Sequence, residues 1–194
     1  MALRRSKTAA SLARTSLSVA CWLFVALLAS AADLPTVHVD TADGVGPRQL
    51  EKQTQASVIR DYLESWQSMG RALGENRIDL LDRFFVGAAK EKLADTIREQ
   101  QKLDIKVGYH DRSHNLKIAF YSPEGLSIQL LDTVEYDVEI VDADNSHVTE
   151  RVRSRYVALL TPAERRWEVR ILQAVPDSLG FAEPAAQQAV KGRQ

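Results

Sequence analysis

Cysteine is almost absent from this chain of 194 residues, in which Cys21 stands alone. Because Cys21 lies in an apolar N-terminal stretch, we expect the rest of the chain to have no disulfide bond and no thiolate chemistry. Glycine-rich phosphate loops, nucleophile elbows, calcium loops and Cys/His clusters are also missing from the sequence. These absences exclude most cofactor-dependent enzymes, and we expect neither a cofactor nor a metal.

The first 31 residues have the pattern of a secretory signal peptide. Basic residues precede an uncharged apolar stretch at residues 17–29, and Ala29 and Ala31 are the small residues that signal peptidase requires. We therefore predict that residues 1–31 are a signal peptide cleaved near Ala31, and that the protein is periplasmic or secreted. An uncleaved membrane anchor is the alternative, although this apolar stretch is shorter than the roughly 20 residues that span a bilayer.

Acidic residues outnumber basic ones once this segment is removed. Cleavage near Ala31 leaves 21 Lys and Arg residues against 26 Asp and Glu residues, a net charge of −5. Nucleic-acid-binding proteins usually carry a basic surplus. The sequence therefore argues against a nucleic-acid partner, and we expect membrane contact only through the N-terminal segment if it stays uncleaved.

The first half of the remaining chain has helical periodicity. Residues 32–48 are rich in turn-forming residues and predict a flexible lead-in. From about residue 49 to Leu73, apolar side chains recur at steps of three and four, which predicts an amphipathic helix. Two shorter helices are predicted at residues 78–85 and 88–103.

The second half alternates with a period of two. Five strands are predicted, at residues 105–109, 116–121, 126–141, 147–160 and 167–175. The first two would be joined by a polar loop that contains His110 and His114. Residues 177–194 lack apolar anchors and predict a disordered tail. Helices followed by an antiparallel meander predict an α+β domain over residues 49–176, with the helices packed on a curved antiparallel sheet.

This order of elements resembles the nuclear transport factor-like (cystatin-like cone) superfamily. Within it, Trp66-Gln67-Ser68, the run Arg155-Tyr156-Val157 and the closing residues 167–171 look like the intermembrane-space domain of plastid division proteins. The resemblance covers roughly residues 54–176. It implies a cone-shaped pocket between a bent sheet and its helices, and frequent dimers. It implies no single activity, because the superfamily includes polyketide cyclases and steroid isomerases beside interaction modules.

A polar cluster is predicted on the inner, otherwise apolar face of the sheet. The hairpin between the two long strands sets Asp132 opposite Tyr156, and a pairing of Tyr156 with Ile171 would bring Ser154 and Gln173 beside them. A carboxylate in apolar surroundings has a raised pKa and suits a general base or a ligand anchor. We therefore expect ligand binding by Asp132, Ser154, Tyr156 and Gln173, with Asp132 and Tyr156 as catalytic candidates. A purely structural role for Asp132, such as a hydrogen bond to Tyr156, is the alternative.

The outer face of the sheet is predicted to be charged around an apolar patch. The same hairpin register pairs Glu135 with Arg153 and Asp137 with Arg151, which favours a solvated ladder of ion pairs. The patch is a candidate interface for a second copy or another envelope protein, and it consists of Leu131, Val157, Leu159 and Leu172. Scattered exposed aliphatic residues, which are normal on protein surfaces, are the alternative.

The histidines do not predict a metal site. Metal centres need three or four converging ligands, whereas His110 and His114 lie in the predicted polar loop and His38 and His147 are isolated in the sequence. Without a complete catalytic constellation, the sequence favours an exported, non-catalytic domain that binds a partner protein, itself or a small apolar ligand. The alternative is a cofactor-free isomerase, dehydratase or cyclase-like enzyme with Asp132 as its general base.

Overall fold

The computed structural model describes residues 34–40, 48–142 and 147–175. The predicted signal peptide and the predicted C-terminal tail lie outside these ranges. The chain divides between Asp33 and Leu34, and all described residues belong to the second unit.

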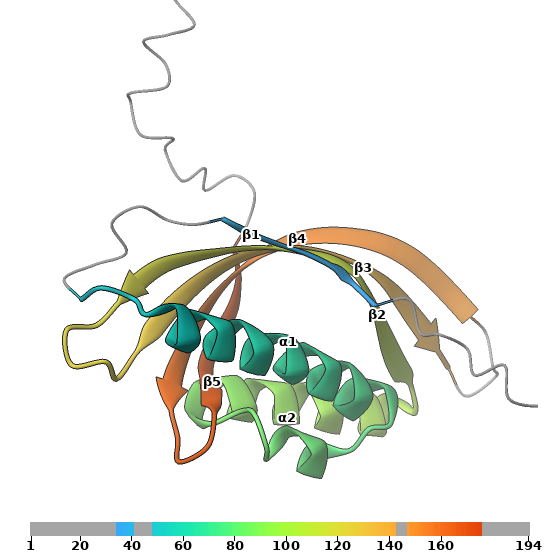
Figure 1. The fold of residues 1–194 in the computed structure, drawn as a ribbon. Coiled ribbons are helices and arrows are strands. Elements are labelled where there is room, and N and C mark those ends of the chain that lie inside the picture. Colours follow the sequence, from blue (N-terminus) through green and yellow to red (C-terminus); the bar gives the residue numbers. More distant parts are fainter. Residues whose placement is uncertain (1–33, 41–47, 143–146, 176–194) are drawn as a thin grey trace, which may run out of the picture. The chain divides into compact units, whose positions relative to one another are not determined.

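This unit is an α+β domain in which two helices cover one face of a curved sheet (Figure 1). Its elements in chain order are β1 (Thr36–Asp40), α1 (Lys52–Gly74), the 3-10 helix η1 (Ile78–Leu81), α2 (Gly87–Leu103), β2 (Lys106–Tyr121), β3 (Ile128–Val141), β4 (His147–Pro162) and β5 (Trp167–Val175). The predicted fold class is confirmed. The short helix predicted at residues 78–85 is the 3-10 helix alone.

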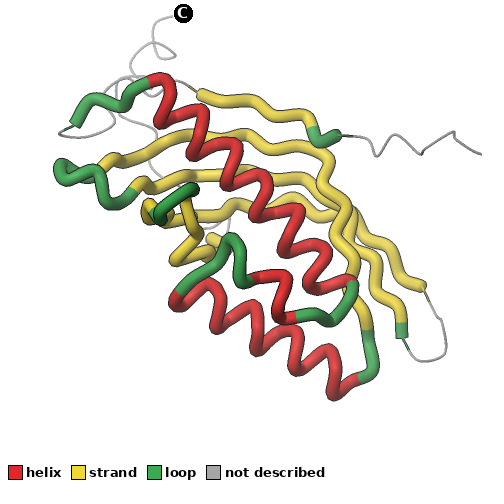
Figure 2. The backbone as a smooth tube through the Cα atoms, turned by 60° about the horizontal axis from the view of Figure 1, so that its bottom comes forward, coloured by secondary structure: helices red, strands yellow, loops and turns green. Residues whose placement is uncertain are grey.

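The sheet has the strand order β1-β2-β3-β4-β5, in which β1 runs parallel to β2 and every other neighbour is antiparallel. Figure 2 shows α1 lying across these strands. The prediction of a flexible lead-in is wrong for Thr36–Asp40, which form the edge strand β1. Val37 and Val39 alternate there with polar residues, but the segment is so short that the surrounding turn-forming residues masked its strand pattern. The sheet is consequently mixed.

The prediction of a loop around His110 and His114 is also wrong. Lys106–Tyr121 form one continuous strand of 16 residues. Its pairing with β3 shifts between Asp111 and Ser113, where Arg112 is an extra residue. A bulge of this kind moves the following residues to the opposite face of the strand. The alternation therefore breaks inside β2, and the sequence looks like two strands with a loop between them.

The predicted register between β3 and β4 is confirmed. Asp132 lies opposite Tyr156 and Leu131 lies opposite Val157. The two predicted charge pairs of the outer face are also in place: Arg151 Nε lies 2.9 Å from Asp137 Oδ1, and Arg153 Nε lies 3.6 Å from Glu135 Oε1.

The register predicted between β4 and β5 is wrong. Tyr156 pairs with Ala174 instead of Ile171, because the pairing shifts between Leu159 and Leu160. This shift exchanges the faces of the last β5 residues. Gln173 pairs with Val157 on the outer face, and Leu172 lies on the inner face.

The core lies between the inner face of the sheet and the two helices. The apolar stripe of α1 supplies Val58, Tyr62, Trp66, Met69 and Leu73, all of which are buried. Full burial of a large apolar side chain contributes about 1.5–3 kcal/mol, so this stripe alone is a major source of stability. No helix within the described ranges is both long and apolar enough to cross a membrane.

A buried carboxylate fastens α1 to the start of β5. The side chain of Asp61 is almost fully buried, and its Oδ2 accepts a hydrogen bond of 2.8 Å from the backbone N–H of Trp167. Exposed Arg60 donates to the other carboxylate oxygen at 3.0 and 2.9 Å. This hydrogen bond joins α1 to β5, although the two residues are 106 positions apart in the sequence.

We expect Asp61→Ala to lower the free energy of unfolding by about 1–3 kcal/mol, because it leaves the buried N–H of Trp167 without an acceptor. Urea denaturation measures this loss. Arg60→Ala is the control and should cost only about 0–1 kcal/mol, because its ion pair is largely exposed on the arginine side. Equal losses in the two variants would contradict a buried tie through Asp61.

Candidate functional site

The side chains of two residues contact one buried carboxylate oxygen of a third, and the three residues come from three different elements. The Tyr62 hydroxyl of α1 donates to Asp132 Oδ2 of β3 at 3.0 Å, and Nδ1 of His114 in β2 lies 2.8 Å from the same oxygen. The side chains of Asp132 and His114 are both completely inaccessible to solvent. Asp132 is thus the centre of a closed polar cluster on the inner face of the sheet.

Local structure explains why these residues meet. The bulge at Arg112 turns His114 to the inner face, where it pairs in register with Val134, two residues along β3 from Asp132. Diagonal neighbours on adjacent strands are within reach of long side chains. Tyr62 comes from the buried stripe of α1, which crosses these strands. The cluster therefore depends on one bulge and on the position of one helix.

The charges of this cluster favour a protonated imidazole. Burial lowers the pKa of His114, but its contacts with Asp111 and Asp132 outweigh burial and raise that pKa to about 9. His114 Nε2 lies 3.8 Å from Asp111 Oδ2, a distance that is longer than a hydrogen bond. At neutral pH the imidazolium therefore donates through Nδ1 to the Asp132 carboxylate.

The phenol of Tyr62 stays neutral beside this ion pair. Burial, and next the negative charge of Asp132, raise the pKa of Tyr62 well above its ordinary value. The hydroxyl consequently remains a hydrogen-bond donor to the carboxylate across the accessible pH range. Both contacts are made to Oδ2, and the other carboxylate oxygen, Oδ1, is buried without a hydrogen-bond partner among the described residues.

The predicted hydrogen bond between Asp132 and Tyr156 is not formed. The Tyr156 hydroxyl instead lies 3.2 Å from the Tyr136 hydroxyl. The indole of Trp66 contacts both groups, with its ring centroid 5.3 Å from that of His114 and 5.1 Å from that of Tyr156. Trp66 thus packs against both the polar cluster and the tyrosines.

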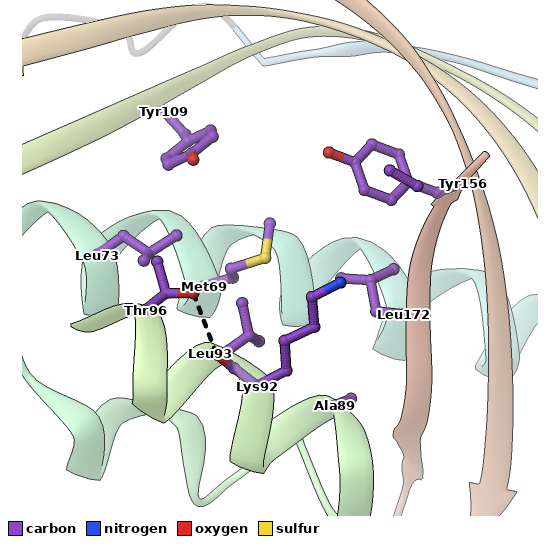
Figure 3. Close-up of a pocket in the computed structure, with 10 residues that line it drawn as sticks. Met69, Leu73, Ala89, Lys92, Leu93, Thr96, Tyr109, Tyr156 and Leu172 are labelled. Atoms are coloured by element: carbon purple, nitrogen blue, oxygen red, sulfur yellow. Dashed lines mark hydrogen bonds between the residues drawn. The ribbon is translucent and has the colours of Figure 1, made fainter. Parts of the chain in front are cut away.

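A pocket opens next to these tyrosines, between the sheet and the two helices. It has a volume of about 180 Å³. Figure 3 shows the rings of Tyr109 and Tyr156 on the sheet side, with side chains of α1, α2 and β5 opposite them. The lining consists of Met69, Leu73, Ala89, Lys92, Leu93, Thr96, Tyr109, Tyr156, Leu172 and Ala174.

Of the four predicted ligand-binding residues, only Tyr156 lines this pocket. Asp132 belongs to the closed cluster, Ser154 lies opposite Val134 further along β4, and Gln173 faces outward. The structure therefore divides a group that the sequence predicted as one site.

The predicted interface is likewise divided. Leu131, Val157 and Leu159 share the outer face with Ile171, whereas Leu172 lines the pocket. Residues on a regular strand keep their predicted face, and Leu172 changes face because Arg170 is an extra residue in β5. The binding of a second copy through the outer patch stays a prediction.

Two residues of the closed cluster were missed by sequence reasoning. His114 was assigned to a loop, although it continues the alternation of the buried residues Leu116 and Ile118. That continuation was the available signal. Tyr62 was placed correctly on the buried stripe of α1, but nothing in the spacing indicated which acceptor its hydroxyl would meet. Within the described ranges, no group of three or more His, Cys, Asp or Glu residues is arranged to hold a metal ion.

The His114 pKa implies a specific pH dependence of stability. The folded-state value of about 9 lies above the ordinary value of 6.5, so protonation stabilises the folded protein. This contribution, of the order of 3 kcal/mol, is fully present below pH 6.5 and is lost as the pH rises through 9. We expect urea denaturation of the wild type to show a lower free energy of unfolding at pH 9.5 than at pH 6.

Two variants isolate the contribution of this imidazole. His114→Asn should be less stable than the wild type at pH 6. Its free energy of unfolding should differ little between pH 6 and pH 9.5. His110→Asn changes a largely exposed imidazole of the same strand and should keep that difference. An unchanged pH dependence in His114→Asn would show that His114 is not protonated in the folded protein.

Comparison with known proteins supports the fold. No protein-family model and no curated protein matches the chain. Among solved structures, the intermembrane space region of the chloroplast protein ARC6 is 13% identical with a TM-score of 0.54, and the match covers 67% of this chain and 100% of that one. LinA is 12% identical with a TM-score of 0.46, over 69% of this chain and 97% of that one.

Aln2 from a Streptomyces species is also 12% identical, with a TM-score of 0.43 over 75% of this chain and 100% of that one. Identities this low show similarity of fold alone. The match to the ARC6 domain agrees with the resemblance seen in the sequence, and the helices packed on the curved sheet have the same architecture. The described domain has the nuclear transport factor-like cone fold.

Proposed function

We propose that the domain binds a small, largely apolar molecule in the pocket between sheet and helices, and holds it without chemical change. The composition of the pocket wall is the observation that carries this proposal. Six of its residues are aliphatic or Met, and two tyrosines close the sheet side. Pockets of small ligands are typically apolar, with a few polar groups that fix the orientation of the ligand.

The size of the pocket limits the ligand. A dry apolar cavity of about 150 Å³ accepts benzene, and this pocket has about 180 Å³. Drug-sized ligands occupy roughly 300–1,000 Å³. A molecule with one ring and a short substituent therefore fits best.

The position of Asp132 argues against the enzyme alternative. A general base must come within hydrogen-bond distance of the proton that it removes. Asp132 has no exposed surface, does not line the pocket and is already bonded to Tyr62 and His114. The cone fold itself fits either an enzyme or a binding domain, so this separation of carboxylate and pocket is what favours binding.

The N-terminal pattern adds a location to the proposal. If residues 1–31 act as the signal peptide that their sequence predicts, the domain binds its ligand in the periplasm or outside the cell. A non-catalytic role there would be that of a carrier or a sensor of a small molecule.

Filling the pocket from its open side tests the proposal. Ala174 is an exposed residue of the pocket wall, so Ala174→Phe places a ring in the pocket without replacing a core residue. With toluene as the probe, NMR titration of the Met69 methyl group should show binding to the wild type. The affinity should fall roughly tenfold or more in Ala174→Phe, because an overfilled site costs about 1–3 kcal/mol.

The adjacent residue provides a matched control. Gln173→Phe introduces the same ring on the outer face of β5 and should leave toluene binding unchanged. Equal binding by the wild type and Ala174→Phe, or no binding by the wild type, would overturn the assignment of this pocket as the ligand site.

A further inference from the structure

We infer that the pocket selects a small aromatic carboxylate, whose negative charge is bound by the ammonium group of Lys92. This inference rests on the proposed function and adds the chemical class of the ligand. Its basis is the set of polar groups that line the pocket, together with the lack of an ion-pair partner for Lys92 among the described residues.

No acidic residue lines the pocket, whose polar residues are Lys92, Thr96, Tyr109 and Tyr156. The Thr96 hydroxyl donates to the Lys92 carbonyl oxygen in the preceding turn of α2, at 3.0 Å. The ammonium group and two phenols remain for a ligand. An ammonium group can only donate hydrogen bonds, so this polar set suits a ligand that accepts them and carries negative charge.

Lys92 differs from other lysines of its helix. Lys90 lies 3.0 Å from Asp82, and Lys102 lies 2.6 Å from Glu99. Within the described part of the chain, Lys92 has no carboxylate partner of this kind. Figure 3 shows its side chain extending from α2 across the pocket toward Leu172. The positive charge at the pocket is therefore available to a ligand.

The tyrosines can supply further hydrogen bonds to the same anion. Burial raises the pKa of both Tyr109 and Tyr156, so their hydroxyls stay neutral and retain their protons. The Tyr156 hydroxyl is 3.2 Å from the Tyr136 hydroxyl. When Tyr136 donates in that contact, the proton of Tyr156 is free to point toward the ligand. Hydrogen bonds to a charged acceptor are about twice as strong as neutral ones.

Three probes of nearly equal size separate charge from shape. Benzoate is the anion, benzamide is its neutral counterpart, and benzylamine is the cation. Isothermal titration calorimetry at low ionic strength should show benzoate binding about three to ten times more tightly than benzamide, and benzylamine binding least tightly. The preference for benzoate should shrink as salt is added, because salt screens an exposed ammonium group.

Two lysine variants test the assignment. Lys92→Met keeps the aliphatic chain and should reduce the benzoate-to-benzamide affinity ratio to about one. Lys90→Met removes a paired lysine two residues away in the same helix and should leave the ratio unchanged. Equal changes in the two variants would point to the general charge of α2 instead of Lys92.

Failure of the inference about charge can be distinguished from failure of the proposed ligand pocket. If benzoate and benzamide bind the wild type equally, and Ala174→Phe weakens both, the pocket binds apolar molecules and the inference about charge is wrong. If none of the three probes binds, or if Ala174→Phe weakens none of them, the proposed ligand pocket fails together with the inference. A benzoate preference that persists in Lys92→Met also overturns the role of Lys92.

Discussion

The hydrogen-bonded ion pair between Asp132 and His114 is the interaction on which the rest of the inner face depends. It joins β2 to β3, and the Tyr62 hydroxyl joins α1 to the same carboxylate oxygen. Breaking a buried pair by removing one partner costs about 3–5 kcal/mol, because the other charge is left without compensation. The pair therefore holds the helix and the two strands in one relative position. Trp66, one turn further along α1, is fixed by the same contacts.

Trp66 contacts two regions of the inner face that have different properties. One is the closed cluster, in which Asp132 is bonded to His114 and Tyr62. The other is the pocket, which has apolar walls, two phenols and the ammonium group of Lys92. A chemical role would require the carboxylate of Asp132 to reach a substrate, whereas this side chain has no exposed surface and does not line the pocket. The fold thus combines a stabilising polar cluster with a separate ligand site.

The sequence predicted those parts of the fold in which the side-chain period is unbroken. The stripe of α1 and the pairing of Asp132 with Tyr156 were both correct, because each follows from regular spacing over many residues. His114, Leu172 and Gln173 were misplaced for a shared reason. Each follows a register shift, and one extra residue in a strand reverses the face of all residues after it. Neither shift is marked by a glycine or proline at its position, so the residue types at the shifts did not indicate them.

The most direct test of this account is the rate at which the Nδ1 proton of His114 exchanges with water, followed by NMR in the native protein. The resonance can be assigned by its loss in His114→Asn. Because the imidazole and Asp132 have no exposed surface, we expect exchange to require global unfolding and to be as slow as that of the core amides. Exchange that is much faster than global unfolding would show that the pair opens to the pocket or to solvent. It would contradict the separation of the closed cluster from the ligand site.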